Sequence, residues 1–129
     1  MKSVFRRFLG SAIAAGALVV ASPLPAHAAA SDCPSNYVCM WEDSGYSGDM
    51  WVRYERGTIY HDKFEIDGWD GDNEISSIVN NTNLYLVVFV DDNWNGTTKC
   101  INPWAQLSSL SSFWNDNIES FVLDDDCIV

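Results

Sequence analysis

The chain has 129 residues, of which 47% are hydrophobic and 13% aromatic, and its formal net charge at pH 7 is −11. Three of the seven Lys and Arg residues and none of the 18 Asp and Glu residues lie before residue 29, so the remainder carries four bases against 18 acids. A surface this acidic repels phosphate backbones, which argues against a nucleic-acid partner and favours cations or basic protein surfaces.

The first 28 residues have the pattern of a secretory leader. A basic start that includes Arg6 and Arg7 precedes an apolar run over residues 8–21, and residues 26–28 form an Ala-x-Ala cleavage site. The run is shorter than the ~18–20 residues that span a bilayer, which argues against a membrane anchor. Cleavage after residue 28 would leave residues 29–129, a length typical of one domain. We therefore expect a secreted, extracellular, monomeric single-domain protein with no membrane partner.

All four cysteines follow the leader and would enter an oxidising compartment, so two disulfides are expected. Four cysteines allow three pairings. The turn-forming residues 34–36 lie between Cys33 and Cys39, which favours a local bridge and leaves Cys100 to pair with Cys127. A zinc site is the alternative, but the spacings match no zinc-finger pattern and only one histidine lies outside the leader.

The chain after the leader has the pattern of β structure almost throughout. Short segments rich in Val, Ile, Phe, Tyr and Trp are separated by Gly, Asn and Asp. The predicted strands are 37–41, 50–54, 75–79, 84–90, 99–101 and 120–123. The segment 84–90 (LYLVVFV) is uniformly apolar and is expected at the centre of a sheet, whereas 105–113 is expected to be a loop with a helical turn. Many short strands in one small domain predict an all-β sandwich or barrel.

Two sequence patterns occur twice each, in alternation. The hairpin motif has an aromatic residue, four residues, an aromatic residue, one residue and Gly, as in WEDSGYSG (41–48) and FVDDNWNG (89–96). The hydroxyl motif is DNEISS at 72–77 and NDNIES at 115–120. The chain therefore contains two copies of one structural unit, which we place at about 33–80 and 81–127.

Each repeated position has a mechanical role. A hairpin that folds over its own sheet needs a positive φ at the bend, which Gly adopts readily. The aromatic pair can stack across the bend, and the hydroxyls of Ser77 and Ser120 can hydrogen-bond hairpin backbone that has no ladder partner. The hairpin-motif residues are Trp41, Tyr46, Gly48, Phe89, Trp94 and Gly96.

This arrangement resembles a βγ-crystallin domain, a two-sheet sandwich of two Greek-key motifs with one such hairpin each. The resemblance covers the whole chain after the leader. Within that fold, a bacterial-type leader followed by CPSNYVCMWED (33–43) is similar to the secreted Streptomyces metalloproteinase inhibitor family, whose members likewise begin with Cys-Pro-x4-Cys. The resemblance implies an inhibitor of extracellular proteases whose partner is a secreted metalloprotease.

The βγ-crystallin resemblance also implies calcium as a cofactor. In calcium-binding members the hydroxyl motif reads Asn/Asp, Asn/Asp, two residues, Ser/Thr, Ser, and the two copies surround each ion with oxygens. Residues 72–77 match at every position, but Glu119 replaces the Ser or Thr of the second copy, so we expect one well-matched site and one poorly matched site. Alternatively, both motifs only brace the hairpins. The candidate ligands are Asp72, Asn73, Glu74, Ser76, Asn115, Asp116, Asn117 and Glu119.

A tight-binding inhibitor offers a rigid convex loop, because pre-organisation lowers the ordering cost of binding. Metalloproteases of the thermolysin type prefer a bulky apolar residue after the scissile bond. By resemblance to the family's Cys–aliphatic reactive bond, Cys100–Ile101 is the candidate bond. The family closes this loop with a nearby second cysteine that this sequence lacks, so an edge strand with a structural disulfide is the alternative. The candidate inhibitory loop is Lys99, Cys100, Ile101, Asn102 and Pro103.

No nucleophile motif accompanies His61, and the abundant carboxylates follow from the acidic composition, so we do not expect an enzyme. The alternative function is a calcium-binding extracellular module with a stability, stress or toxin-like role and no protease target. A carbohydrate-binding face built on Trp69, Trp104 or Trp114 is a weaker hypothesis, because the hairpins already account for two other tryptophans.

Overall fold

The computed structural model describes residues 16, 29–58, 61–66 and 73–128, and every structural statement below concerns these residues. The predicted leader, apart from Gly16, lies outside them, as do Trp69 and Asp72. The regular secondary structure of the described residues consists of a short 3-10 helix, η1 (Ala30–Asp32), and strands, which confirms the all-β prediction. The strands are β1 (Tyr37–Asp43), β2 (Ser47–Glu55), β3 (Asp62–Glu65), β4 (Ser77–Asn81), β5 (Tyr85–Asp91), β6 (Asn95–Ile101), β7 (Gln106–Leu107) and β8 (Ser120–Asp124).

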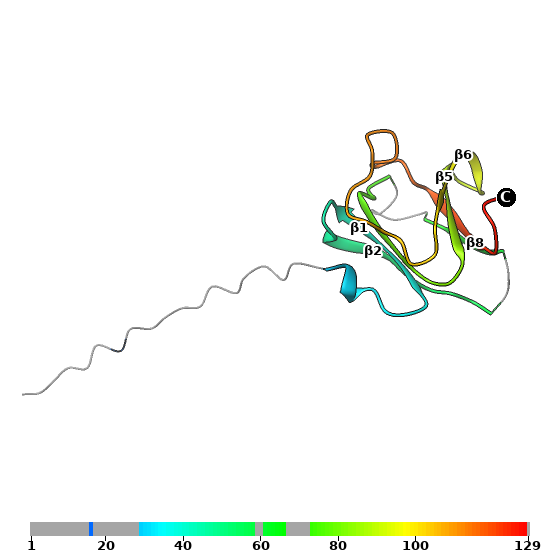
Figure 1. The fold of residues 1–129 in the computed structure, drawn as a ribbon. Helices are drawn as coiled ribbons and strands as arrows, with labels where there is room; N and C mark the ends of the chain where they lie inside the picture. Colours follow the sequence, from blue (N-terminus) through cyan, green and yellow to red (C-terminus); the bar gives the residue numbers. More distant parts are fainter. Residues whose placement is uncertain (1–15, 17–28, 59–60, 67–72, 129) are drawn as a thin grey trace, which may run out of the picture.

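The strands form two antiparallel sheets packed as a sandwich (Figure 1). One sheet has the order β2-β1-β4-β7 and the other the order β3-β8-β5-β6. Each sheet consists mainly of strands from one half of the chain, but β3 and β7 each form the edge of the sheet built by the other half. This exchange joins the two Greek-key halves into one folding unit.

The main hydrophobic core lies between the two sheets, and β5 explains the apolar run in the sequence. Leu86 and Val88 belong to the main core, whereas Val87 and Phe89 belong to a second cluster on the outer face of the same sheet. Because successive side chains of a strand point to opposite faces, a strand covered on both faces is apolar at every position. Each fully buried aliphatic side chain contributes about 1.5–3 kcal/mol to stability.

Each terminal segment is tied by a disulfide to a strand at the outer face of one sheet. Cys33 is bonded to Cys39 of β1, and Cys100 of β6 is bonded to Cys127. The first bridge packs against Trp41 and Val79, and the second lies beside the outer cluster of β5 and β8. The expectation of two disulfides is confirmed.

Each of the six predicted strands overlaps an observed strand, whereas β3 and β7 were not predicted. The segment 105–113 contains the two-residue strand β7, which was not expected, and the helical turn begins only at Ser111, whose carbonyl accepts from the amides of Trp114 and Asn115. Among the described residues, no helix has the length and apolar character required to cross a membrane.

Candidate functional site

The two hairpins between paired strands have nearly the same internal structure. Gly48 and Gly96 both have positive φ, 74° and 80°, and a Cβ atom at either position would collide with an aspartate side chain of the same hairpin. The rings of Trp41 and Tyr46 meet edge to face, with centroids 5.4 Å apart. The bend is therefore covered by the aromatic pair and requires glycine, as the hairpin motif predicts.

The last serine of each hydroxyl motif holds the neighbouring hairpin. Ser77 Oγ donates to the carbonyl of Asp43 at 2.7 Å and accepts from the amide of Tyr46 at 3.1 Å. Ser120 Oγ repeats this arrangement, donating to Asp91 at 2.8 Å and accepting from Trp94 at 3.3 Å. Both serines are fully buried. The bracing role assigned to them in the sequence is therefore present in both halves.

The first hydroxyl motif and the second meet in an open, oxygen-lined hollow of about 530 Å³, which we call the hairpin pocket. Ser76 Oγ lies 3.3 Å from Asp116 Oδ1, and the Asp116 amide donates to the carbonyl of Ile75 at 3.0 Å. Asn73 and Asp116, which occupy equivalent motif positions, both have a φ of 57°. The residues that line the pocket are Glu42, Asp43, Ser44, Asn73, Glu74, Ser76, Asn115 and Asp116.

The chemistry of the hairpin pocket fits a hard cation. It offers carboxylate, amide and hydroxyl oxygens from both halves of the chain, and these are the ligands that Ca²⁺ takes in proteins. Asn73, Glu74, Ser76, Asn115 and Asp116, all predicted ligands, lie together there, while Asp72 falls outside the described residues. The sequence prediction had not included Glu42, which comes from the first hairpin.

The equivalent positions of the second half carry different donors. Val90 stands where the first half has Glu42, and Glu119 stands where it has Ser76. The side-chain amide of Asn117 donates to the carbonyl of Phe113 at 3.1 Å, and the backbone of Glu119 is bonded to Phe89 and Ile66. The second site therefore has a different donor set from the hairpin pocket, in line with the expected mismatch at Glu119.

The predicted inhibitory loop requires a correction at Ile101. This residue ends β6, is only 3% exposed and belongs to the main core between the sheets. Its side chain could enter a protease cleft only by leaving that core, so the structure does not support Ile101 as the inserted residue. Lys99 and Cys100 are half-buried in the same strand, whereas Asn102 is exposed and Pro103 half-exposed in the turn that follows.

Sequence reasoning missed two buried residues that support this turn, Asn80 and Thr82. Both are fully buried, and the Asn80 side-chain amide donates to the carbonyl of Asn102 at 3.0 Å. The sequence signal is an Asn-x-Thr triplet at the end of β4, a pattern that is also the acceptor sequence for N-glycosylation. A local Asn–Thr hydrogen bond at the end of a strand is the alternative meaning of that triplet.

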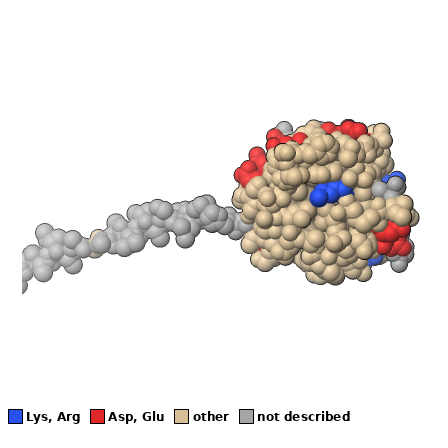
Figure 2. Space-filling model, turned by 45° about the horizontal axis from the view of Figure 1, so that its top comes forward, with Lys and Arg blue, Asp and Glu red and all other residues tan. Residues whose placement is uncertain are grey.

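Charge is distributed unevenly over the surface. Figure 2 shows Asp and Glu side chains along the upper rim and at one side of the face in view, around a central area that holds a basic patch.

Near the C-terminus, Asp124, Asp125 and Asp126 form a cluster of carboxylates, and Asp124 contacts His61 Nδ1. Burial raises the pKa of Asp124, but hydrogen bonding with Asp125 and the proximity of His61 outweigh burial and place this pKa below its ordinary value.

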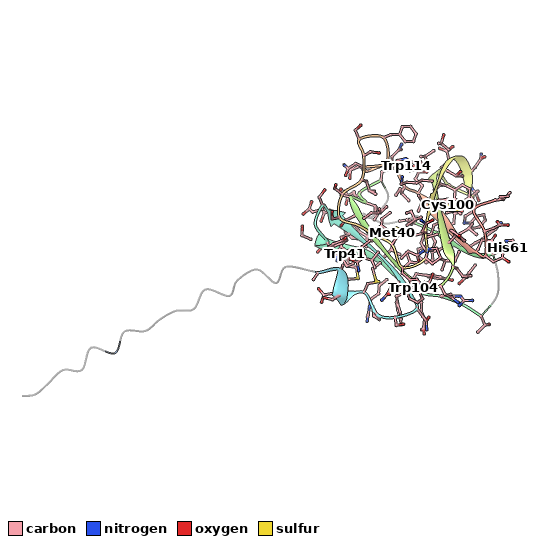
Figure 3. The ribbon with its side chains drawn as sticks, in the orientation of Figure 1. Met40, Trp41, His61, Cys100, Trp104 and Trp114 are labelled. Atoms are coloured by element: carbon pink, nitrogen blue, oxygen red, sulfur yellow. A yellow bond between two sulfur atoms is a disulfide. The ribbon has the colours of Figure 1, made fainter. Side chains whose placement is uncertain are left out.

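Of the tryptophans considered for a carbohydrate face, the two that the structure describes, Trp104 and Trp114, do not share a surface. Trp104 is 55% exposed, whereas Trp114 is 9% exposed and belongs to the main core. Figure 3 shows these two residues at opposite ends of the domain. Trp69 lies outside the described residues. Trp104 and Trp114 therefore provide no common stacking platform.

Comparison with known proteins identified one family and one fold. The family model for peptidase inhibitor family I36 matches residues 26–101. A βγ-crystallin domain from work on the evolution of the eye-lens fold aligns with a TM-score of 0.58 and 24% identity, over 70% of this chain and 87% of that one. A domain from Clostridium beijerinckii aligns with a TM-score of 0.56 and 16% identity, over 70% of this chain and 99% of that one.

A third βγ-crystallin domain, from Flavobacterium johnsoniae, aligns with a TM-score of 0.53 and 19% identity, over 71% of this chain and 98% of that one. At these identities the structural matches establish the fold alone, and they confirm the expected βγ-crystallin sandwich. A comparison with curated proteins gave no match.

Proposed function

The chain belongs to peptidase inhibitor family I36, and we propose that it is exported and inhibits an extracellular metalloprotease. The family match over residues 26–101, which contain β1 to β6, is the observation that carries this proposal. A peptidase inhibitor on a βγ-crystallin fold is not an enzyme, which agrees with the sequence prediction.

Two features support export and action outside the cell. The first 28 residues have the pattern of a secretory leader, and both disulfides lie in the domain that follows it. Disulfides persist in oxidising compartments, where secreted proteases also act. An acidic inhibitor would also be attracted to a protease with a basic cleft rim.

The test is an inhibition assay with the disulfide-bonded protein against thermolysin-like metalloproteases, with a subtilisin-like serine protease as the comparison. We expect an inhibition constant in roughly the nanomolar range for a metalloprotease, as is typical of pre-organised protease inhibitors. Inhibition of the serine protease alone would correct the target class. Absence of inhibition across the panel would contradict the proposal.

The second candidate function is a calcium-binding extracellular module, and the hairpin pocket is the observation that favours it. Asn73, Glu74, Ser76 and Asp116 would hold the ion together with Glu42. Bound calcium would supply a cross-link between the two halves of the chain, because its ligands come from both.

Titration calorimetry and thermal unfolding test this second function. Calcium is expected to raise the melting temperature, because a ligand that binds only the folded state stabilises it by mass action. Ser76→Ala, which removes one hydroxyl ligand, should reduce both the heat and the shift. No binding heat and no shift in the parent protein would eliminate this function.

A further inference from the structure

The turn that follows β6 presents an exposed aromatic side chain in an uncommon backbone conformation. The amide of Ala105 donates to the carbonyl of Asn102 at 3.2 Å, which closes a four-residue turn with Pro103 and Trp104 at its centre. Trp104 has a φ of 62° and is 55% exposed. A proline followed by a positive φ is the pattern of a type II turn, in which the second central position normally holds Gly or Asn. We call residues 102–105 the Trp104 turn.

A bulky residue keeps a positive φ only where its surroundings fix the backbone, as the buried serines do for Tyr46 and Trp94 in the two hairpins. Here the surroundings are a buried clamp beneath the turn. The side-chain amide of Asn80 donates to the carbonyls of Leu84 and Asn102, at 2.8 and 3.0 Å, and lies 3.5 Å from the carbonyl of Ile101. Asn80 Oδ1 accepts in turn from the Thr82 hydroxyl at 2.8 Å.

Backbone bonds hold the other side of the same turn. The amide of Trp104 donates to the carbonyl of Thr82 at 3.3 Å, and the amide of Asn80 donates to the carbonyl of Ala105 at 2.9 Å. The preceding strand is tied to the C-terminal segment through Cys100 and Cys127. The turn is therefore fixed by a buried side chain, by backbone hydrogen bonds and by a disulfide in the adjoining strand.

These contacts hold the backbone of the turn without using the Trp104 side chain, which remains free to bind a partner. A tryptophan carried on a fixed convex turn loses little conformational freedom on binding, and tryptophan is among the residues that most often dominate interface energies. Ile101, the other large apolar residue of this region, is committed to the core. Trp104 is therefore the residue of this region that can fill an apolar subsite.

We propose that the Trp104 turn is the protease-binding element, and that the Trp104 side chain occupies an apolar subsite in the cleft of the inhibited endopeptidase. This inference rests on the proposed inhibitory function and specifies which residue of the fold makes the contact. Asn80 and Thr82 act as positioning residues for the turn. The partner it fits is a protease whose cleft accepts a large aromatic side chain.

The decisive variant is Trp104→Gly, which removes the side chain and places at the positive φ the residue that adopts it without strain. The matched control is Phe113→Ala, because Phe113 is also an exposed aromatic residue, 52% exposed, and adjoins Trp114 at the opposite end of the domain. Circular dichroism and melting temperatures verify that both variants remain folded. Trp104→Phe is the conservative replacement.

Inhibition constants are measured for all four proteins against the protease that the parent protein inhibits most strongly. Trp104→Gly is expected to raise the inhibition constant at least ~30-fold, as expected for an interface hot spot, whereas Phe113→Ala changes it less than ~3-fold and Trp104→Phe retains most of the affinity. Folded Trp104→Gly that inhibits like the parent overturns this inference and leaves the inhibitory function intact. An equal loss in Phe113→Ala also overturns it. A parent protein that inhibits no protease removes the proposed function and this inference together.

Discussion

At the scale of single residues, two serine hydroxyls link the repeat in the sequence to the repeat in the structure. Ser77 and Ser120 each bond two backbone groups at the bend of a hairpin, one carbonyl and one amide. A buried backbone group without a partner costs free energy, so the hydroxyl is required wherever this bend occurs. The sequence predicted this role because both copies place serine at the same distance from the motif start.

Replacing Ser77 with alanine is therefore expected to lower the free energy of unfolding by about 2 kcal/mol, since it leaves two partly buried backbone groups without their hydroxyl partner. Urea denaturation measures the change. Ser47→Ala is the matched control in the same hairpin, because its hydroxyl donates to Ser44 at an exposed site, and its cost should stay below about 0.5 kcal/mol. Equal costs for the two variants would contradict the bracing role.

Tyr54 provides a pH-dependent test at a single side chain. Its hydroxyl donates to Asp62 Oδ1 at 2.6 Å, and burial, this hydrogen bond and the charge of Asp62 together raise the pKa of Tyr54 to about 12. Because the folded pKa exceeds the ordinary value near 10, the associated stability is complete below pH 10 and is lost as the pH rises toward 12.

Phenolate absorbance, followed by titration at high pH, is expected to show a tyrosine that ionises near pH 12 in the parent protein and is missing from Tyr54→Phe. The subtraction is needed because burial also raises the pKa of Tyr46. A difference curve centred near pH 10 would show that the Asp62 contact does not hold the proton.

At the scale of elements, the central strands and the edge strands β2 and β6 were predictable, whereas the short edge strands β3 and β7 were not. An apolar segment such as 84–90 predicts a strand, because both faces of the sheet are buried at that strand. The edge strand β3 has the sequence DKFE, and β7 contains only Gln106 and Leu107, so neither carries a periodic apolar pattern. Ile101 was misread for a related reason: its burial depends on the opposite sheet, and no local pattern reveals which face of a strand end is covered.

The side chain of Asn80 fixes the connection between β4 and β5 by its hydrogen bonds. We therefore predict that removing this side chain destabilises the fold. Asn80→Ala would leave the carbonyls of Leu84 and Asn102 without the amide that binds them, so we expect a loss of about 3 kcal/mol in the free energy of unfolding. Asn81→Ala is the neighbouring control, since its half-buried amide makes one bond, to Cys33, and should cost about 1 kcal/mol. Chemical denaturation of both variants distinguishes them, and a smaller loss at Asn80 than at Asn81 would contradict the clamp.

At the scale of the whole molecule, the two candidate functions occupy different ends of one sandwich. The hairpin pocket includes Asn115 and Asp116, next to Trp114, whereas the Trp104 turn lies at the far end of the domain (Figure 3). The Trp104 turn, proposed for inhibition, and the hairpin pocket, proposed for calcium, therefore use different residues. A cation in the pocket would join the two halves, and the turn would be held by its own clamp and by Cys100–Cys127.

This separation predicts that calcium changes stability without changing inhibition. Asp116→Ala, which removes a carboxylate of the pocket, is expected to abolish the rise in melting temperature with calcium and to leave the inhibition constant within about twofold of the parent. Trp104→Gly is expected to do the reverse. Effects at distant sites without shared partners add, so the double variant should show both losses at their single-variant sizes. Inhibition assays with calcium-stripped and calcium-loaded inhibitor, at one fixed calcium level for the protease, measure this independence, and tighter inhibition by the calcium-loaded protein would show instead that the two ends are coupled through the fold.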